Sequence, residues 1–577
     1  MKRIYYILFL LLALIVYSCE DLLIKTPEDQ ISDPDFWNTD SDLQLYVNGL
    51  YGTLPGWNAM GAGGTRLPDA TTDVCVASGN FLSEGKTWIN GELTVPASGG
   101  GWSWTNIRRV NYFLDNANRV PGNSADKKQY IGEGYFFRAW FYFELLKQFG
   151  DLPIIKHALS STDSNLYAKR SSRTDVVSFI INDLDSAILK MGFKATAGQG
   201  RLNSDVAALF KARVCLYEGT WEKYHQNDAF KGKTNGTAFL TAAADAALKV
   251  INNKNYSLST GNKKQVYYEL FNQEDYSKNP EVLLWRQYDN DKYSDDIFGN
   301  QMWNWPQGCG ISHEMMLTYL CSDGKPIAVS PLFQGDKDIR QIIVNRDERL
   351  VQSVMNPGDP IMINLKGDTT KFVTPTLTTQ NFCPTAYESQ KFRRPQLNPR
   401  SGNYSNSMGY IIFRYAEALL IYAEAKAELG QLTQADVDMT INKLRDRVGM
   451  PPLVLSSITP DPNWPDWGYT VPDYLQEVRR ERVVELLNEG FRFDDLKRWR
   501  ADKLIVDKRP KGAYYTAELK AVNSKLKVDA NNYLDPLVGV LNGPNGGFGF
   551  NPARDYLRPI PTNELTLNPN LVQNPGW

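Results

Sequence analysis

The stretch YIGEGYFFRAWFYFELLKQFGDLPI, residues 130–154, decides the class of fold. Its apolar side chains recur at helical spacing and form two faces, one of Tyr135, Ala139, Tyr142, Leu146 and Phe149 and the other of Phe136, Trp140 and Phe143. A helix that is apolar on most of its sides is a buried helix. Gly150 and Pro153 follow at positions where helices commonly end. The stretch therefore predicts a long helix in the interior of a helical protein.

Further segments show the same helical periodicity: 104–120, 175–191, 203–221, 240–253, 410–430, 435–449 and 474–499. The segments 410–430 and 435–449 resemble a helix hairpin of tetratricopeptide type, and stacked hairpins form a curved superhelix. Long polar and aromatic segments lie between the helices, and such segments in a compact protein are usually functional. We predict a mostly α fold, a superhelix of tetratricopeptide-like helical pairs with an irregular, loop-rich ligand-binding face.

The chain begins like an exported protein. Lys2 and Arg3 are followed by an apolar run over residues 4–16. This run of about 13 residues fits the apolar core of a secretory signal and falls short of the roughly 20 residues that cross a bilayer. We therefore expect residues 1–18 to be a signal peptide.

Cys19 follows at the point where this signal should be cut. Residues 16–19, Val-Tyr-Ser-Cys, resemble a bacterial lipobox, in which the cysteine thiol is acylated and becomes the new N-terminus. Glu20 and Asp21 resemble the surface-export signal of Bacteroidetes lipoproteins. We expect a lipid anchor on Cys19 and a position on the outside of the outer membrane. An ordinary signal peptide with an incidental cysteine is the alternative.

The composition argues against several classes of function. A net charge of −2 over 577 residues gives no reason to expect nucleic acid or an anionic membrane surface as a partner. Of the six cysteines, those after Cys19 are widely spaced without a CxxC pair, and the three histidines form no HExxH motif. We expect neither a metal site nor a disulfide scaffold. The odd number of cysteines after Cys19 leaves at least one thiol free unless it pairs between molecules.

No cofactor motif is complete. Residues 79–88, GNFLSEGKTW, approach a phosphate-binding loop, but Asn80 stands where the motif needs its first glycine. We therefore expect no cofactor. No low-complexity linker interrupts the chain, so residues 19–577 are predicted to form one compact unit.

Four segments point to one family: 135–154, 414–430, 479–499 (RRERVVELLNEGFRFDDLKRW) and the terminal 556–577 (YLRPIPTNELTLNPNLVQNPGW). They resemble the SusD/RagB family, whose members are nutrient-binding outer-membrane lipoproteins of Bacteroidetes. The resemblance runs from Cys19 to Trp577, with an N-terminal half at about 19–230 and a C-terminal half at about 270–577. Trp577 departs from the pattern, because tyrosine is commoner there.

The resemblance implies a protein without catalytic activity that sits as a lid on a SusC-like TonB-dependent transporter. Such a protein captures a nutrient, usually a glycan, and delivers it to the barrel. We therefore expect a glycan receptor at the cell surface, attached to the membrane through its lipid only. A peptide-binding receptor of RagB type and a surface glycosidase or peptidase are the alternatives.

The charges of segment 474–499 could instead suggest an active site. They include Arg479, Arg480, Glu481, Arg482, Glu485 and Glu489. We interpret them as a structural ion-pair network, since Arg482 and Glu485 are i, i+3 neighbours on a helix. Asp494 and Asp495 are adjacent, so their side chains point about 100° apart on a helix. Glycoside hydrolysis needs two carboxyl groups that face one bond, which this pair does not offer.

Sugars offer flat apolar faces ringed by hydroxyls, so a receptor needs exposed aromatic platforms with amide, carboxylate and guanidinium groups nearby. Two loop regions supply both kinds of group. The first carries Arg66, Asp73, Asn80, Trp88 and Trp102, and the second carries Tyr288, Trp303, Asn304 and Trp305. The family's ligand sites are built from corresponding regions, although its members differ in these loops. We predict that these side chains contribute to the ligand site.

Overall fold

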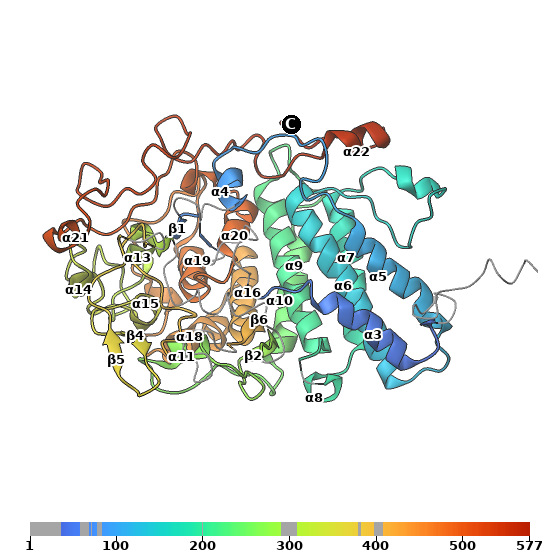
Figure 1. Cartoon of the computed structure of the whole chain (residues 1–577), viewed down its shortest axis with the longest axis horizontal. Coiled ribbons are helices and arrows are strands. Elements are labelled where there is room, and N and C mark those ends of the chain that lie inside the picture. Colours follow the sequence, from blue (N-terminus) through green and yellow to red (C-terminus); the bar gives the residue numbers. More distant parts are fainter. Residues whose placement is uncertain are drawn as a thin grey trace, which may run out of the picture.

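The computed structural model describes residues 36–57, 69–70, 72–77, 84–198, 200–289, 308–378, 382–396 and 408–577. Within these ranges the protein is predominantly helical, with long helices on one side and shorter elements joined by long connections on the other (Figure 1). None of the described helices is both long enough and apolar enough to span a bilayer.

Helix α6 (Ala125–Phe149) is the long interior helix that the sequence predicts. Its N-terminus is capped by Ser124, whose hydroxyl accepts a hydrogen bond from the Lys127 N–H, and it ends before Gly150. Phe136 and Tyr142, from the two predicted faces, are both fully buried. The Phe136 and Trp140 rings pack against Phe210 of a neighbouring helix, at centroid distances of 5.3 and 5.0 Å.

The other helices complete a mostly α architecture. They are α3 (Asp40–Tyr51), α4 (Glu84–Ile89), α5 (Thr105–Asn116), α7 (Arg173–Lys190), α8 (Lys194–Ala197), α9 (Ser204–Tyr224), α10 (Thr237–Ile251), α11 (Val266–Leu270), α13 (His313–Thr318), α14 (Ile339–Ile342), α15 (Glu348–Ser353), α16 (Tyr415–Glu428), α17 (Gln434–Met439), α18 (Ile441–Arg447), α19 (Asp473–Glu485), α20 (Arg492–Arg498), α21 (Ala517–Val522) and α22 (Thr562–Leu567).

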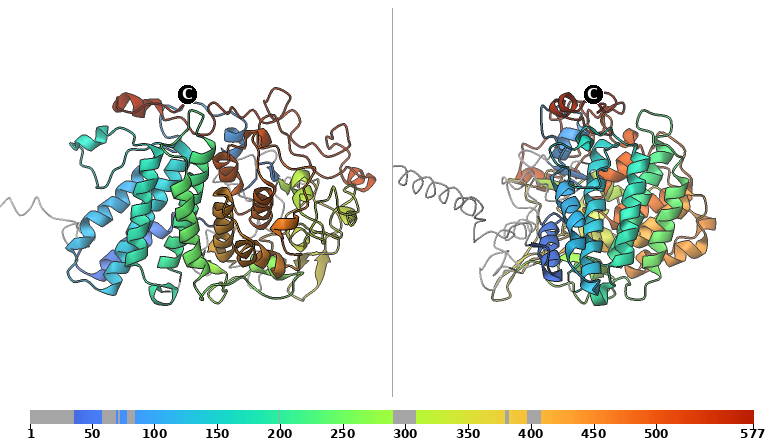
Figure 2. Two further views of the ribbon diagram at one scale, coloured as in Figure 1. Left: turned by 180° about the vertical axis from the view of Figure 1, so that it is seen from behind. Right: turned by 90° about the vertical axis from the view of Figure 1, so that its right-hand side faces the viewer.

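The long helices stack in chain order. Helix α5 packs on α6, α6 on α7, α7 on α9, α9 on α10, and α10 on α16, which in turn packs on α18 and α19. Figure 1 and Figure 2 show these helices side by side from both faces of the molecule. The predicted superhelix of helical pairs is therefore confirmed, as is the loop-rich character of the rest of the chain.

Two predicted helices have different bounds in the structure. The segment 410–430 begins with a strand, β6 (Tyr410–Arg414), because these residues pair with β2 (Val282–Arg286) from a distant part of the chain. The segment 474–499 is divided into α19 and α20. The break contains Asn488 and Gly490, whose φ angles of 62° and 84° lie in the left-handed region that an α-helix does not allow.

Strands among the described residues form three two-stranded antiparallel sheets. Besides β2–β6, strand β1 (Cys75–Ala77) pairs with β3 (Cys309–Ile311), and β4 (Pro360–Ile363) pairs with β5 (Thr369–Lys371). The first two sheets each join residues more than a hundred positions apart. They therefore fix where the long connections begin and end.

The charged residues of α19 form the predicted ion-pair network in the core. Glu485 is fully buried and faces the guanidinium groups of Arg447, Arg414 and Arg349, at 2.7, 2.8 and 3.2 Å. Burial alone would raise the pKa of Glu485, but these three cations hold it well below its usual range.

The two adjacent aspartates of α20 have different partners. Asp494 pairs with Lys147 at 3.0 Å, whereas Asp495 pairs with Arg482 and Arg498 at 2.8 and 2.9 Å. The two carboxylates therefore face different partners. This agrees with the prediction from the sequence that their side chains point in different directions.

The C-terminal segment crosses the ends of the N-terminal helices. Asn574 Nδ2 donates to the carbonyl of Phe149 at 3.0 Å, and Arg170 Nη1 donates to the carbonyl of Val572 at 2.7 Å. The described cysteines are buried and form no disulfide bond with one another: Cys75, Cys215, Cys309, Cys321 and Cys383.

Candidate functional site

Several predicted site residues lie outside the described residues. These are Arg66, Asn80, Trp303, Asn304 and Trp305, together with the predicted lipidation site Cys19. The described residues that flank the segments 58–68, 290–307 and 397–407 nevertheless show where each of these segments begins or ends.

Three of these flanking residues meet at one place. The Trp57 backbone N–H donates to the Tyr288 hydroxyl at 2.8 Å, and Trp57 Nε1 donates to the carbonyl of Met408 at 2.8 Å. Trp57 precedes segment 58–68, Tyr288 lies just before segment 290–307, and Met408 follows segment 397–407. We call the cluster of Trp57, Tyr288 and Met408 the loop base, because all three segments start or end there.

Close packing explains the glycine beside Trp57. A Cβ atom on Gly56 would lie 2.2 Å from the Tyr288 hydroxyl oxygen and 3.0 Å from Arg286 Cδ. Contacts of this length do not occur without a shift of the neighbouring atoms. Only a residue without a side chain lets the chain pass Tyr288 at this distance.

The two predicted loop regions also meet at a second place. Ala77 pairs with Cys309 and Cys75 pairs with Ile311 in the β1–β3 sheet. Strand β3 follows segment 290–307 directly, and β1 lies within the first loop region. Segment 290–307 is therefore preceded by Tyr288 of the loop base and followed by a strand that pairs with the first loop region. That the two regions build one site stays a prediction.

A cavity of about 380 Å³ lies next to the loop base. Phe392 and Tyr410, which contact the Trp57 ring edge-on at 5.6 and 4.9 Å, form part of its wall. The lining also includes charged side chains that are paired: Arg213 donates to both carboxylate oxygens of Glu417. The cavity thus combines aromatic surface with ion pairs that are already satisfied.

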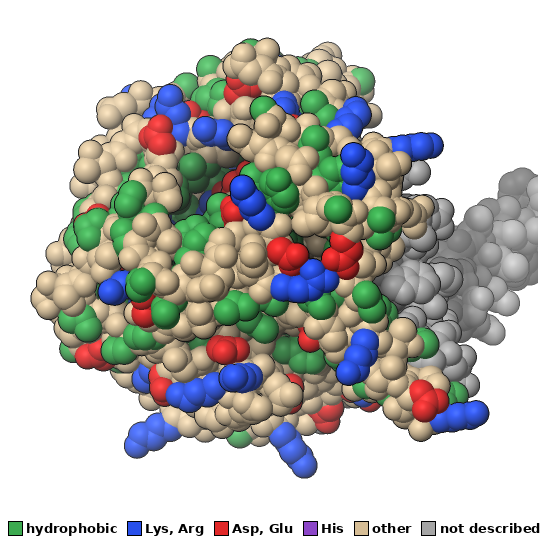
Figure 3. All heavy atoms as spheres, turned by 90° about the vertical axis from the view of Figure 1, so that its left-hand side faces the viewer, with side chains coloured by type: hydrophobic (Ala, Val, Ile, Leu, Met, Phe, Trp, Pro, Cys, Tyr) green, Lys and Arg blue, Asp and Glu red, His purple; other side chains and the backbone are tan. Residues whose placement is uncertain are grey.

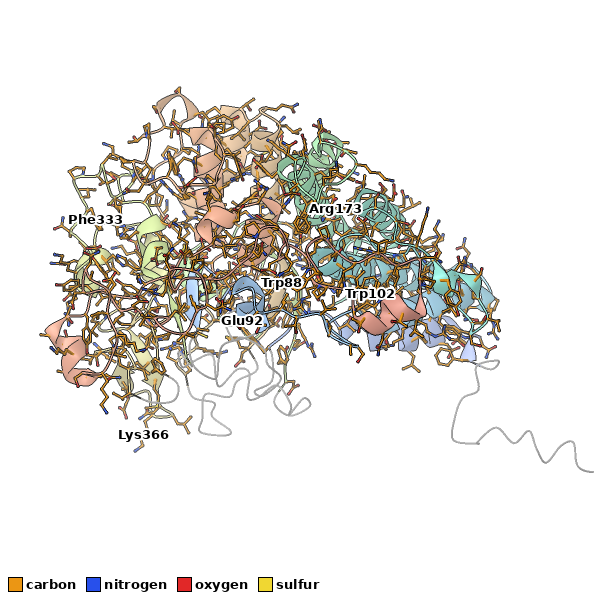
Figure 4. The ribbon with its side chains drawn as sticks, turned by 90° about the horizontal axis from the view of Figure 1, so that it is seen from above. Trp88, Glu92, Trp102, Arg173, Phe333 and Lys366 are labelled. Carbon is orange, nitrogen blue, oxygen red and sulfur yellow. The ribbon has the colours of Figure 1, made fainter. Side chains whose placement is uncertain are left out.

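The structure corrects the assumption that Trp88, Trp102 and Tyr288 are exposed platforms, because they are only 5%, 7% and 4% exposed. Figure 4 labels Trp88 and Trp102, which lie among packed side chains. Trp88 donates from Nε1 to the carbonyl of Asp555, and Trp102 packs edge-on against Phe149 at 5.0 Å. Tyr288 accepts its hydrogen bond inside the loop base. Contact of these residues with a ligand stays a prediction.

Asp73 is held away from the loop base. Arg492 Nε donates to its carboxylate at 2.8 Å, and Asp73 lines a separate cavity of about 590 Å³. Arg492 also donates from its backbone N–H to Asp69 at 3.0 Å. The structure therefore does not bring Asp73 together with Tyr288.

Comparison with known proteins assigns the chain to a family. A family model described as the SusD family matches residues 255–577, which is more than half of the chain. The chain belongs to the SusD family. A second model, described as "Starch-binding associating with outer membrane", matches residues 102–216 of this SusD-family protein.

Curated relatives and solved structures agree with this assignment. SusD-like proteins P38 and P2 of Formosa agariphila are 24% and 26% identical to the chain, over 84% and 100% of its length and 88% and 100% of their own. A SusD-like protein and a SusD-like carbohydrate binding protein, both from Bacteroides fragilis, each superpose with a TM-score of 0.71, at 22% and 21% identity. The two superpositions include 96% and 93% of this chain, and 100% of each of the two solved structures. These structures confirm the fold.

Sequence reasoning missed Gly56, Trp57, Met408 and Arg492 in this SusD-family protein. Trp57 and Gly56 carried a usable signal, since they open a glycine-rich region that also holds predicted site residues. Met408 and Arg492 carried none, because only the tertiary structure brings them to their partners. Among the described residues, no cluster of His, Cys, Asp and Glu is arranged to hold a metal ion.

Proposed function

We propose that this protein is a non-catalytic cell-surface receptor for a nutrient glycan, which binds on the segments that leave the loop base. The observation that carries the proposal is the contact of Trp57 with both Tyr288 and Met408. It joins the ends of three segments, two of which hold the predicted residues Arg66, Trp303, Asn304 and Trp305. Aromatic rings beside amide and guanidinium groups are the chemistry that a sugar needs.

The receptor role also draws on the family. One matching family model carries the words "Starch-binding associating with outer membrane", and one similar structure is named a carbohydrate binding protein. A receptor without a channel needs a barrel beneath it. We propose a SusC-like TonB-dependent transporter as that partner and a lipid on Cys19 as the anchor, with the protein on the outside of the outer membrane. Co-purification with such a transporter from mildly extracted outer membranes tests the partner.

The absence of catalysis is proposed on the state of the carboxylates. Glu485 and Glu489 are bound by arginine or lysine, and Asp494 and Asp495 have separate cationic partners. A glycosidase needs one carboxylic acid to protonate the leaving group while a second carboxylate acts on the same bond. None of these four carboxylates is arranged for that task.

A binding screen with two tryptophan variants tests the proposal. The full-length protein is titrated with a panel of oligosaccharides and peptides, and the mixtures are analysed for new reducing ends or amines. We expect an oligosaccharide to bind without being cleaved. The double variant Trp303→Ala, Trp305→Ala should bind it roughly 5–30-fold more weakly than the wild type. Tyr167→Ala is the matched control, because Tyr167 is an exposed aromatic residue remote in sequence from these segments. Binding of peptides alone, formation of products, or unchanged affinity in the double variant would each contradict the proposal.

A further inference from the structure

The cavity of about 590 Å³ lies between α13 and α19 and shares no lining residue with the cavity at the loop base. Its walls come from α13, α19, the connection 461–467 and the segment 504–510. This volume lies within the roughly 300–1,000 Å³ range of small-molecule sites. Figure 3 shows a deep hollow, with charged side chains around it, in the side of the molecule on which α13 and α21 lie. We call this space the α13–α19 cavity.

Trp464 supplies an aromatic surface to this cavity. It lies on the connection before α19 and is half-buried, so part of its ring is accessible. The guanidinium of Arg480 lies 4.2 Å from the ring centroid, and Arg480 is itself fixed by Asp461 and Glu477. The ring is therefore held in place by a cation–π contact before any ligand arrives.

One cation of the wall, Lys508, has no counter-charge among the described residues. Five basic residues line the cavity, Arg479, Arg480, Arg492, Lys508 and Arg509, against three acidic ones, Asp73, Glu314 and Asp461. Asp73 is paired with Arg492 and Asp461 with Arg480, while Glu314 accepts the backbone N–H of Lys511. Arg479 and Arg509 are paired with Glu428 and Asp535, which lie outside the wall. Lys508 is exposed and makes no ion pair with any described residue. An uncompensated cation and an aromatic ring that line the same cavity suit an anionic ligand with an apolar face.

We propose that the α13–α19 cavity binds an anionic sugar unit, with Trp464 against the sugar face and Lys508 against its carboxylate or sulfate. The amide of Asn463, which lines the same space, offers a donor and an acceptor to hydroxyl groups. The inference rests on the proposed function in one respect only, which is that the ligand is a glycan. The site itself is distinct from the loop base.

Calorimetric titration of the full-length protein in mild detergent tests the site. The probes are a galacturonic acid trisaccharide, a sulfated galactose trisaccharide and the uncharged galactose trisaccharide. We expect at least one acidic probe to bind more tightly than the uncharged one, and which of the two does so distinguishes carboxylate from sulfate. Trp464→Ala should weaken that binding roughly 5–30-fold, by the range typical of an aromatic anchor. Lys508→Gln should remove most of the preference for the acidic probe.

Controls separate this site from the loops and from folding. Lys520→Gln changes an exposed lysine of α21 outside the cavity and should leave all affinities unchanged. Lys508 is exposed, so Lys508→Gln should keep the wild-type melting temperature even if Trp464→Ala does not. Equal binding of acidic and uncharged probes, or wild-type affinity for the acidic probe in both cavity variants, would overturn the inference. If binding is lost only in the Trp303→Ala, Trp305→Ala variant, the proposed function stands and this inference fails. If binding is lost only in Trp464→Ala and Lys508→Gln, the result supports the cavity as the binding site and counts against the loop site.

Discussion

Arg447 of α18 donates from Nη2 to both carboxylate oxygens of Glu485 of α19, at 2.7 Å each, within the core. Glu485 is also bound by Arg414 at the start of α16 and by Arg349 of α15. One carboxylate thus connects four elements of the C-terminal half. Guanidinium groups are suited to this role, because their planar donors match a carboxylate and stay charged when buried.

Replacement of this carboxylate should strongly destabilise the fold. In Glu485→Gln, three buried guanidinium groups lose their shared counter-charge, and loss of one partner in a buried pair typically costs about 3–5 kcal/mol. We expect a decrease of that size in the free energy of unfolding, measured by urea titration. Glu518→Gln is the control, because Glu518 pairs with Arg340 on the surface, where such pairs contribute roughly 0–1 kcal/mol. Similar losses in the two variants would contradict the assigned role of Glu485.

Asp69 should make stability depend on pH in the opposite sense from an ordinary paired carboxylate. Burial raises the pKa of Asp69 to about 6 in the folded protein, although the backbone N–H of Arg492 favours its ionised form. The unfolded chain has the ordinary pKa of about 3.9. Between these two values the folded state binds more protons than the unfolded state, so this group's contribution to stability falls as pH rises.

The variant Asp69→Asn isolates this contribution. We expect the unfolding free energy of the variant, relative to the wild type, to increase by about 3 kcal/mol in total as the pH rises from well below 3.9 to well above 6, with most of the increase between these two values. Chemical unfolding of both proteins at several pH values measures the difference. A difference that is independent of pH would show that Asp69 titrates alike in both states.

The helical part of the fold could be predicted because its signal is local. Helix α6 is apolar on most sides, and this pattern is present in the sequence whatever it packs against. Strand β6 could not be predicted in this way. Its residues are also compatible with a helix, and only the pairing with β2, which lies far away in the chain, selects the strand.

The site was less predictable for the same physical reason. Trp88 and Trp102 stand in glycine-rich, polar surroundings that suggest exposure, but their burial depends on Asp555 and Phe149. Neither partner can be identified from the residues around the tryptophan. The grouping of the two loop regions was predictable from the family resemblance, whereas the contacts that hold them together were not.

Cys19→Ala should release the protein from the membrane. A lipid on Cys19 is the attachment that the sequence predicts, and the apolar run before it is too short to span a bilayer. We expect the variant in the periplasm or the medium after cell fractionation. Glu20→Ala with Asp21→Ala is the comparison, which should keep the protein in the outer membrane but reduce its cleavage by protease added to whole cells. Full retention of Cys19→Ala in the outer membrane would refute the anchor.

Gly56 offers a test of the loop base without removing any of its side chains. A methyl group at this position would meet the Tyr288 hydroxyl, which is also the acceptor for the Trp57 N–H. Tyr288 must then move, and with it the start of segment 290–307. Neither Gly56 nor Tyr288 lies in a described helix, so we expect the change to act on binding more than on folding.

We therefore expect Gly56→Ala to weaken glycan binding about tenfold, a loss of roughly 1.4 kcal/mol, with a melting temperature within a few degrees of the wild type. Gly52→Ala is the matched control, because a Cβ atom at Gly52 meets no atom within 4 Å. Adding Tyr288→Phe to Gly56→Ala removes the hydroxyl that the methyl group meets and should restore part of the affinity. The readouts are calorimetric affinity for the oligosaccharide found in the binding screen and thermal unfolding followed by circular dichroism. If Gly56→Ala binds as tightly as Gly52→Ala, the loop base does not position the ligand site; if it loses affinity only through unfolding, the contact serves the fold instead.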